Sequence, residues 1–204
     1  MKRVIMGRLF YIMGKSSAGK DTIYKELAAR KDLALHPVIM YTTRPIRDKE
    51  EQGREYFFVD DARAEELCRE GRVIEMRCYD TIHGIWKYFT VDDKNIDLSD
   101  KDYLGIGTLE SYEKIRDYYG EDKVVPVYIQ VDDGIRLQRA LDRERRALRG
   151  RYEEMCRRFL ADEADFSEEK LKAAGITERF QNYGDRETCI NNIAAFIRNR
   201  REQA

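Results

Sequence analysis

The sequence has few prolines, no excess of charge of either sign and no long apolar run. Three prolines in 204 residues, with no stretch rich in glycine or serine, leave no obvious linker between domains. The 38 basic side chains nearly balance the 39 acidic ones, so the net charge of -1 gives no general attraction to nucleic acid or membrane. No apolar run approaches the roughly 20 residues that span a bilayer. We therefore expect one domain whose anion sites are local, with neither nucleic acid nor membrane as a partner.

The cysteines form no C-x-x-C pair; they are Cys68, Cys78, Cys156 and Cys189. This scatter favours reduced thiols over disulfides or a zinc site. The start of the chain, "MKRVIMGRLFYIM", is similar to a short signal peptide. However, Arg8 interrupts its apolar stretch, which then runs directly into a glycine-containing loop. We interpret it as a buried strand and expect a cytoplasmic protein.

The apolar pattern predicts an α/β fold. The run "LFYIM" at residues 9–13 is typical of a strand buried on both faces, and helical spacing follows at residues 23–28. After residue 92, apolar runs at 103–108 and 123–131 alternate with charged helical patterns. Strands that alternate with helices predict a central parallel sheet flanked by helices, joined by right-handed crossovers.

Residues 50–91 show a different pattern. The segments "REYFFV", "RVIEMRCY" and "WKYFTV" have the composition of short strands, and "ARAEELCREG" between them has that of a helix. We expect this region to form a small, mostly antiparallel insertion.

The stretch "GKSSAGKDT" at residues 14–22 nearly matches the phosphate-binding pattern G-x-x-x-x-G-K-[ST]. Glycines let the backbone curl so that its N–H groups point at phosphate oxygens, at the positive end of the following helix. Because a predicted strand precedes the stretch and a predicted helix follows it, we favour nucleotide binding over an ordinary turn. The candidate ATP-binding residues here are Gly14, Ser16, Ser17, Ala18, Gly19, Lys20, Asp21 and Thr22.

Asp21 departs from the pattern, which has a serine or threonine hydroxyl at this position. Two negative groups roughly 4 Å apart repel by about 4 kcal/mol at an effective dielectric of 20. A cation between them reverses the sign of that interaction, and a carboxylate is a good ligand for Mg²⁺. Asp21 lies in the first turn of the predicted helix, where it either weakens nucleotide binding or binds the metal ion directly. We favour the role of metal ligand.

A second basic segment, "TTRPIRDKEEQGREYFFV", covers residues 42–59. Arg44 and Arg47 lie on either side of Pro45 and can grip a monophosphate from two sides. Tyr56 adds a hydroxyl donor. Taken alone, two arginines are as readily explained as surface charge.

The order of these motifs resembles the guanylate kinase family. A phosphate loop is followed by "TTRPxR", then by G-x-x-Y-x-F-V and "VIE", and the resemblance runs from about residue 9 to residue 196. It implies a P-loop kinase that transfers a phosphoryl group from ATP to GMP with Mg²⁺. It also implies a core of about residues 1–41, 92–137 and 175–204, a monophosphate-binding insertion of about 42–91, and a helical lid of about 138–165.

For the acceptor, the resemblance assigns Arg44, Arg47 and Tyr56 to the phosphate and Glu75 to guanine. The segment "WKYFTV" then implies Tyr88 for the phosphate and Thr90 for the base, although Phe89 replaces the usual glycine and strand packing is an equal explanation for Tyr88.

For the lid, the resemblance assigns the arginines of "LQRALDRERRALRGRYEEMCRRF" to the transferring phosphates. Arg139 and Arg143 share one helical face and Arg158 lies on the next helix; solvated, salt-bridged surface charge is the alternative. Asn182 in "RFQNY" is placed near adenine. The catalytic set implied is Lys20, Arg44, Arg139, Arg143 and Arg158.

Gly105 and Gly107 occupy positions where the family usually carries acids. One hypothesis is that Asp21, on the loop, supplies the carboxylate near the metal ion that these acids would otherwise provide. Three functions stay open: a GMP kinase; a kinase of another phosphorylated acceptor, such as ribose 1,5-bisphosphate; or a non-catalytic module that binds phosphopeptides. The ribose 1,5-bisphosphate kinases resemble the chain at "GKD" but lack the "TTRPxR…Y…E" set. We expect ATP and GMP as partners, and a monomer or homodimer.

Overall fold

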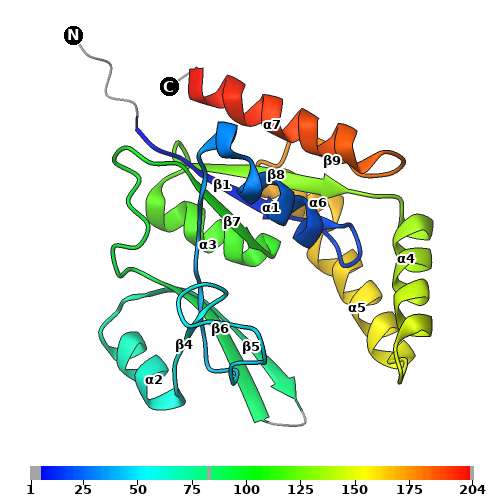
Figure 1. The fold of residues 1–204 in the computed structure, drawn as a ribbon, viewed down its shortest axis with the longest axis horizontal. Helices are drawn as coiled ribbons and strands as arrows, with labels where there is room; N and C mark the ends of the chain where they lie inside the picture. Colours follow the sequence, from blue (N-terminus) through cyan, green and yellow to red (C-terminus); the bar gives the residue numbers. More distant parts are fainter. Residues whose placement is uncertain (1–5, 82–83, 203–204) are drawn as a thin grey trace.

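The core of the protein is a five-stranded parallel sheet. The computed structural model describes residues 6–81 and 84–202. In these residues the strand order is β2-β7-β1-β8-β9, and every neighbouring pair is parallel (Figure 1). The strands are β2 (His36–Pro37), β7 (Tyr103–Gly107), β1 (Leu9–Met13), β8 (Val124–Gln130) and β9 (Arg179–Gln181). The predicted fold class is confirmed.

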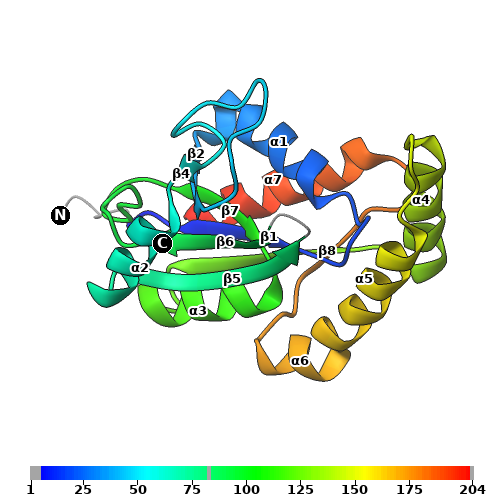
Figure 2. The same cartoon turned by 90° about the horizontal axis from the view of Figure 1, so that it is seen from below.

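Helices cover both faces of this sheet (Figure 2). α1 (Lys20–Ala29) and α7 (Arg186–Glu202) lie on one face, whereas α3 (Leu109–Tyr119) and α6 (Glu168–Ala173) lie on the other. The alternation of side chains along β1 explains the two layers. Phe10 and Ile12 join the apolar cluster of α1 and α7, and the other three residues of the strand join the cluster of α3 and α6.

A second, four-stranded sheet of order β4-β3-β6-β5 forms the insertion. β3 pairs with β6 and β5 pairs with β6 in antiparallel fashion, while β3 and β4 are parallel. Its elements are β3 (Tyr41–Thr42), β4 (Phe57–Phe58), α2 (Asp61–Arg69), β5 (Val73–Thr81) and β6 (Gly84–Val91). Phe89 is fully buried against Ala64 and Leu67 of α2, and its bulk therefore serves the packing of this sheet.

α4 (Asp133–Arg146) and α5 (Tyr152–Asp165) form a helical pair at the opposite end of the molecule from α2 (Figures 1 and 2). Sequence analysis anticipated both helices but not the short η1 (Lys31–Leu33) or α6. α6 has six residues, too few for an apolar period to show. It begins at Ser167, whose hydroxyl accepts a hydrogen bond from the Lys170 N–H.

A tyrosine ring explains the two glycines of β7. Tyr11 is the register partner of Gly105 on the neighbouring strand. A Cβ at Gly105 would lie 2.6 Å from Tyr11 Cδ2, and one at Gly107 would lie 2.5 Å from Ser111 Oγ and closer still to the Tyr11 hydroxyl. That hydroxyl shares a 2.8 Å hydrogen bond with Ser111 Oγ. Burial raises the pKa of Tyr11 well above its ordinary value, so the phenol stays neutral.

We expect Gly107→Ala to destabilise the fold by about 1–3 kcal/mol, because the new methyl group overlaps two buried hydroxyls. The same substitution in a Tyr11→Phe background should be less destabilising, since one of those hydroxyls is gone. Urea denaturation of the four proteins of this cycle measures the difference. An equal effect of Gly107→Ala in both backgrounds would show that the tyrosine does not determine the need for glycine.

Candidate active site

The loop between β1 and α1 is shaped by Gly19 and supported by Asn182. Gly19 is the N-cap of α1 and has a φ of 89°, in the left-handed region that favours glycine. A Cβ there would lie 2.5 Å from Asn182 Nδ2. Asn182 is buried and donates from Nδ2 to the Ala18 carbonyl at 2.7 Å. The side-chain amide therefore fixes the loop backbone, while its contact with adenine stays a prediction.

No side chain caps α1 at its N-terminus. The first N–H groups of the helix and the ammonium group of Lys20 therefore share one anion-binding end.

The three lid arginines that the sequence singled out all reach this loop region. Arg143 Nη1 donates to Ser17 Oγ at 3.3 Å, and Arg158 Nη2 donates to Ser16 Oγ at 3.2 Å. Arg139 Nη2 donates to the Asn182 carbonyl at 2.9 Å. Cations from two helices thus lie over the segment whose backbone would hold a phosphate chain.

Sequence reasoning missed Arg136, the most deeply buried cation of this region. Its side chain is 1% exposed, and its guanidinium lies 4.4 Å from the centre of the Phe159 ring. It pairs with Asp133 at 2.8 Å and Glu163 at 2.6 Å, and contacts Asp162 at 3.3 Å. Because these partners come from two helices, no local sequence pattern distinguishes Arg136 from the arginines around it.

The same cluster fixes the loop from its outer side. Arg136 Nη1 donates to the Ser16 carbonyl at 3.2 Å, and Asp162 accepts a hydrogen bond from the Ser16 N–H at 2.8 Å. Lys15 forms a 2.8 Å ion pair with Glu163. Both polar groups of the Ser16 backbone are therefore held by α4 and α5, so the position of the loop depends on these two helices.

In the insertion, Arg44 is nearly inaccessible and is oriented by Glu50. Its two terminal nitrogens donate to the two oxygens of Glu50 at 3.0 and 2.9 Å. The guanidinium also lies 5.5 Å from the ring centres of Tyr56 and Phe58. The backbone N–H of Arg47 donates to Glu50 Oε2 at 2.8 Å. One carboxylate thus organises the basic segment.

Two of the six predicted acceptor residues line one cavity of about 480 Å³ together with residues of α1 and α5, whereas Arg44, Glu75 and Thr90 are not part of its wall. Tyr56 and Tyr88, whose ring centres are 5.6 Å apart, come from the insertion. Asp21 comes from the first turn of α1, and Arg158 comes from α5. Arg47 lies apart from this cavity and lines a neighbouring one of about 960 Å³ that includes Trp86.

Glu75 is buried and has partners for both carboxylate oxygens. Thr90 Oγ1 donates to Oε1 at 2.9 Å, as the register pairing of the two residues allows. Arg77 Nε donates to Oε2 at 3.0 Å. Sequence reasoning missed Arg77, although a signal was present: it lies two residues after Glu75 on the same strand and hence on the same face.

Asp21 is accessible to a metal ion and its phosphate ligands. Its side chain is 82% exposed, and Oδ2 lies 3.9 Å from Lys20 Nζ. Over residues 6–81 and 84–202, no three His, Cys, Asp or Glu side chains gather to form a metal cluster. A carboxylate oxygen beside a phosphate-binding loop fits Mg²⁺ whose other ligands are phosphate oxygens and water.

Comparisons with known proteins give the same assignment as the motifs. The family model described as guanylate kinase matches residues 6–91. The guanylate kinase from Wolbachia sp. subsp. Brugia malayi is 32% identical over 127 residues, which cover 60% of this chain and 61% of that protein. The one from Porphyromonas gingivalis is 28% identical over 130 residues, covering 61% and 65% respectively. Over these stretches the chain is similar to guanylate kinases.

The fold of the chain agrees over nearly its whole length with a solved structure. The crystal structure of guanylate kinase from Anaplasma phagocytophilum superposes with a TM-score of 0.65, at 17% sequence identity. The match covers 97% of this chain and 87% of that one.

The sequence matches cover less of the chain than the fold match does. The chain spans less than two thirds of the length of the curated relatives given above. The family-model match ends at the last residue of β6, so α4, α5 and the Arg136 cluster lie beyond it. None of the helices in the described part of the chain has both the length and the apolar character to cross a membrane.

The Arg44–Glu50 pair predicts a pH dependence of stability. Hydrogen bonds from Arg44 hold the pKa of Glu50 below its ordinary value of 4.5. A carboxyl whose pKa is lower in the folded state stabilises the fold above its unfolded pKa, and this stabilisation is lost as the pH falls through the folded pKa. We therefore expect the urea midpoint of wild type to exceed that of Glu50→Gln at neutral pH, with the gap closing below pH 4.5. A gap that stays constant down to pH 3 would contradict this role for Glu50.

Proposed function

We propose that this protein transfers the γ-phosphoryl group of ATP to GMP, giving ADP and GDP. The observation that carries the proposal is the convergence of Asp21, Tyr56, Tyr88 and Arg158 on one cavity. In such a cavity a donor phosphate held by the loop and an acceptor phosphate held by the insertion would face each other. We also propose a cytoplasmic location and a monomer or homodimer.

The chemistry needs positioning and charge neutralisation more than a covalent intermediate. Lys20 and the N–H groups of the loop bind the β- and γ-phosphates of ATP. Arg44, oriented by Glu50, and the Tyr56 hydroxyl hold the acceptor phosphate in line. When bound, Mg²⁺ neutralises charge on the transferring phosphoryl oxygens, and Asp21 is its ligand from the protein.

The lid arginines complete the charge clamp. Arg139, Arg143 and Arg158 already contact the loop or the segment that supports it. We propose that the chain works as a core of about residues 1–41, 92–137 and 175–204, an insertion of about 42–91 and a lid of about 138–165. Closure of the last two over the core excludes water from the reacting phosphates.

A panel of acceptors tests the reaction. With Mg²⁺ and ATP, purified protein should release ADP in response to GMP, and Lys20→Met should lower the rate by about 100-fold or more, since it removes a cation that stabilises the transferring charge. Lys25→Met, at an exposed position of the same helix, is the control. ADP release with ribose 1,5-bisphosphate alone, or phosphopeptide binding without turnover, would overturn the proposal.

The role of Asp21 gives predictions of opposite sign with and without the metal. Asp21→Ser should bind Mg²⁺–ATP more weakly than wild type and require more Mg²⁺ for half-maximal rate. In excess chelator the same variant should bind free ATP more tightly, because the repulsion between carboxylate and phosphate is gone. A nucleotide-binding titration at several Mg²⁺ concentrations measures both effects. Faster turnover in the serine variant, or an unchanged requirement for Mg²⁺, would show that Asp21 is not a ligand.

A further inference from the structure

Two successive peptide units of the phosphate loop are held by side chains of α4 and α5. The peptide between Lys15 and Ser16 donates its N–H to Asp162 Oδ2 at 2.8 Å. The peptide between Ser16 and Ser17 accepts at its carbonyl from Arg136 Nη1 at 3.2 Å. In a planar trans peptide the C=O and the N–H point in opposite directions. The bond from Arg136 therefore also fixes the direction of the Ser17 N–H, which points away from the guanidinium.

Ser17 has a backbone conformation that serine rarely adopts. Its φ is 62°, in the left-handed region that favours glycine. Residues in this region let neighbouring N–H groups of a loop turn toward one side, which is how such loops form anion-binding concavities. Within the described residues, the Ser17 N–H has no hydrogen-bond partner in the protein. Because serine has no intrinsic preference for this conformation, contacts from outside the loop have to hold it.

The guanidinium of Arg136 is suited to hold this peptide because its own orientation is fixed. Nε donates to Asp133 Oδ1 at 2.9 Å, and Nη2 donates to Glu163 Oε1 at 2.6 Å. Its flat face packs against the ring of Phe159, 4.4 Å from the ring centre. The two acids thus direct the remaining nitrogen, Nη1, at the Ser16 carbonyl. A lysine ammonium lacks this planar fork and cannot serve all three groups in the same geometry.

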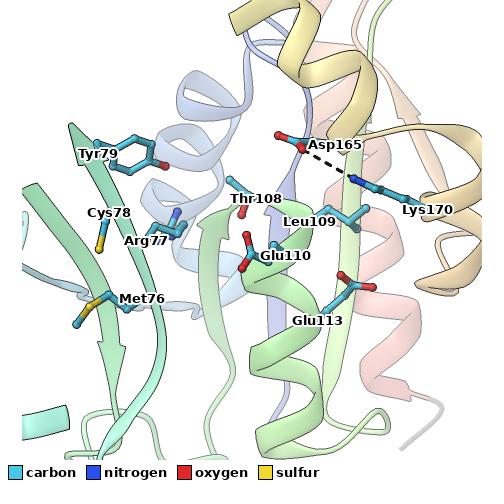
Figure 3. Close-up of a pocket in the computed structure, with 10 residues that line it drawn as sticks. All are labelled: Met76, Arg77, Cys78, Tyr79, Thr108, Leu109, Glu110, Glu113, Asp165 and Lys170. Carbon is cyan, nitrogen blue, oxygen red and sulfur yellow. Dashed lines mark ion pairs between the residues drawn. The ribbon is translucent and has the colours of Figure 1, made fainter. Parts of the chain in front are cut away.

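The end of α5 that carries Glu163 is itself held on the core. Phe166, which follows the helix, is buried, and its ring centre lies 5.7 Å from that of Tyr128 on β8. Figure 3 shows Asp165 directed toward Lys170 of α6, and the two form a 3.9 Å ion pair at the wall of a cavity of about 700 Å³. The acids around Arg136 therefore belong to a fixed support, against which the loop is oriented.

We propose that Arg136 is a positioning residue for phosphoryl transfer, which aims the Ser17 N–H at the terminal phosphates of the donor nucleotide. This inference rests on the proposed function. Arg136 acts through the Ser16 carbonyl and does not touch the substrate itself. Without that bond the peptide can rotate, Ser17 relaxes to a common serine conformation, and the phosphates lose one N–H donor. Because the insertion holds the acceptor, acceptor binding does not depend on Arg136.

Arg136→Lys tests this role with the positive charge retained. We expect kcat/KM for ATP to fall by about tenfold or more, because a donor of the loop is misplaced, while the KM for GMP is unchanged. Titration calorimetry should show weaker binding of Mg²⁺–ATP. Arg145→Lys, at an exposed position of the same helix, is the matched control. Urea denaturation checks that each variant folds; if Arg136→Lys does not, Arg136→Met/Glu163→Gln is compared with Glu163→Gln, so that opposite charges are removed together.

Ser17→Gly gives a second test of the same mechanism. Glycine adopts the left-handed conformation without steric cost, so its loop depends less on the bond from Arg136. The effect of Arg136→Lys on kcat/KM for ATP should therefore be smaller in the Ser17→Gly background than in wild type. The contact between Arg143 and Ser17 Oγ is absent from both glycine proteins and cancels in this comparison. An equal effect in the two backgrounds would show that Arg136 does not act through this peptide.

The outcomes separate this inference from the proposed function. If wild type phosphorylates GMP and Arg136→Lys keeps the wild-type kcat/KM for ATP, or impairs ATP and GMP binding equally, the positioning role is wrong while the kinase activity stands. If wild type phosphorylates no acceptor, the proposed function fails, and an equal affinity of wild type and Arg136→Lys for Mg²⁺–ATP would overturn the positioning role separately. A loss confined to the donor nucleotide, and reduced by Ser17→Gly, supports it.

Discussion

The position of the loop relative to α4 and α5 depends on the interactions of the buried Arg136 guanidinium. It joins acids from α4 and α5 to the backbone of Ser16, so the loop and the lid helices share one set of ion pairs. The guanidinium is buried, whereas Asp133 and Glu163 are partly exposed, so removing these acids would leave a buried positive charge without compensation. The lid arginines reach Ser16 and Ser17 from helices that this cluster has already positioned.

In the insertion, as around Arg136, arginine side chains are held by ion pairs with carboxylates. Glu50 orients Arg44, and Arg77 covers Glu75, so each functional cation is fixed by a carboxylate from its own sheet or loop. Neither anion is offered to solvent or ligand as an isolated charge. The cavity beside them carries donors from Tyr56, Tyr88 and Arg77, which suit a ligand that carries a phosphate.

The sequence predicted the elements of the fold and the loop more fully than the contacts among them. "LFYIM" and "GKSSAGKDT" are local patterns, because burial of a strand and curling of a loop are decided by neighbours in the chain. The importance of Arg136 could not be predicted, since its partners lie on another helix and on a loop more than 100 residues earlier. The contact between Glu75 and Arg77 could have been predicted, because residues two apart on a strand lie on the same face. The split of residues 36–43 between two sheets depends on tertiary pairing and has no local signal.

Tyr11 and the glycines of β7 form a unit that constrains which substitutions this part of the sequence tolerates. An acidic side chain at position 107 requires that the tyrosine ring be replaced, because both side chains need the same volume. Loss of the tyrosine alone would open a hole in the layer beneath α3, where Tyr11 packs against Tyr112. Either single substitution is therefore unfavourable, and packing separates this arrangement from one that carries an acid at position 107.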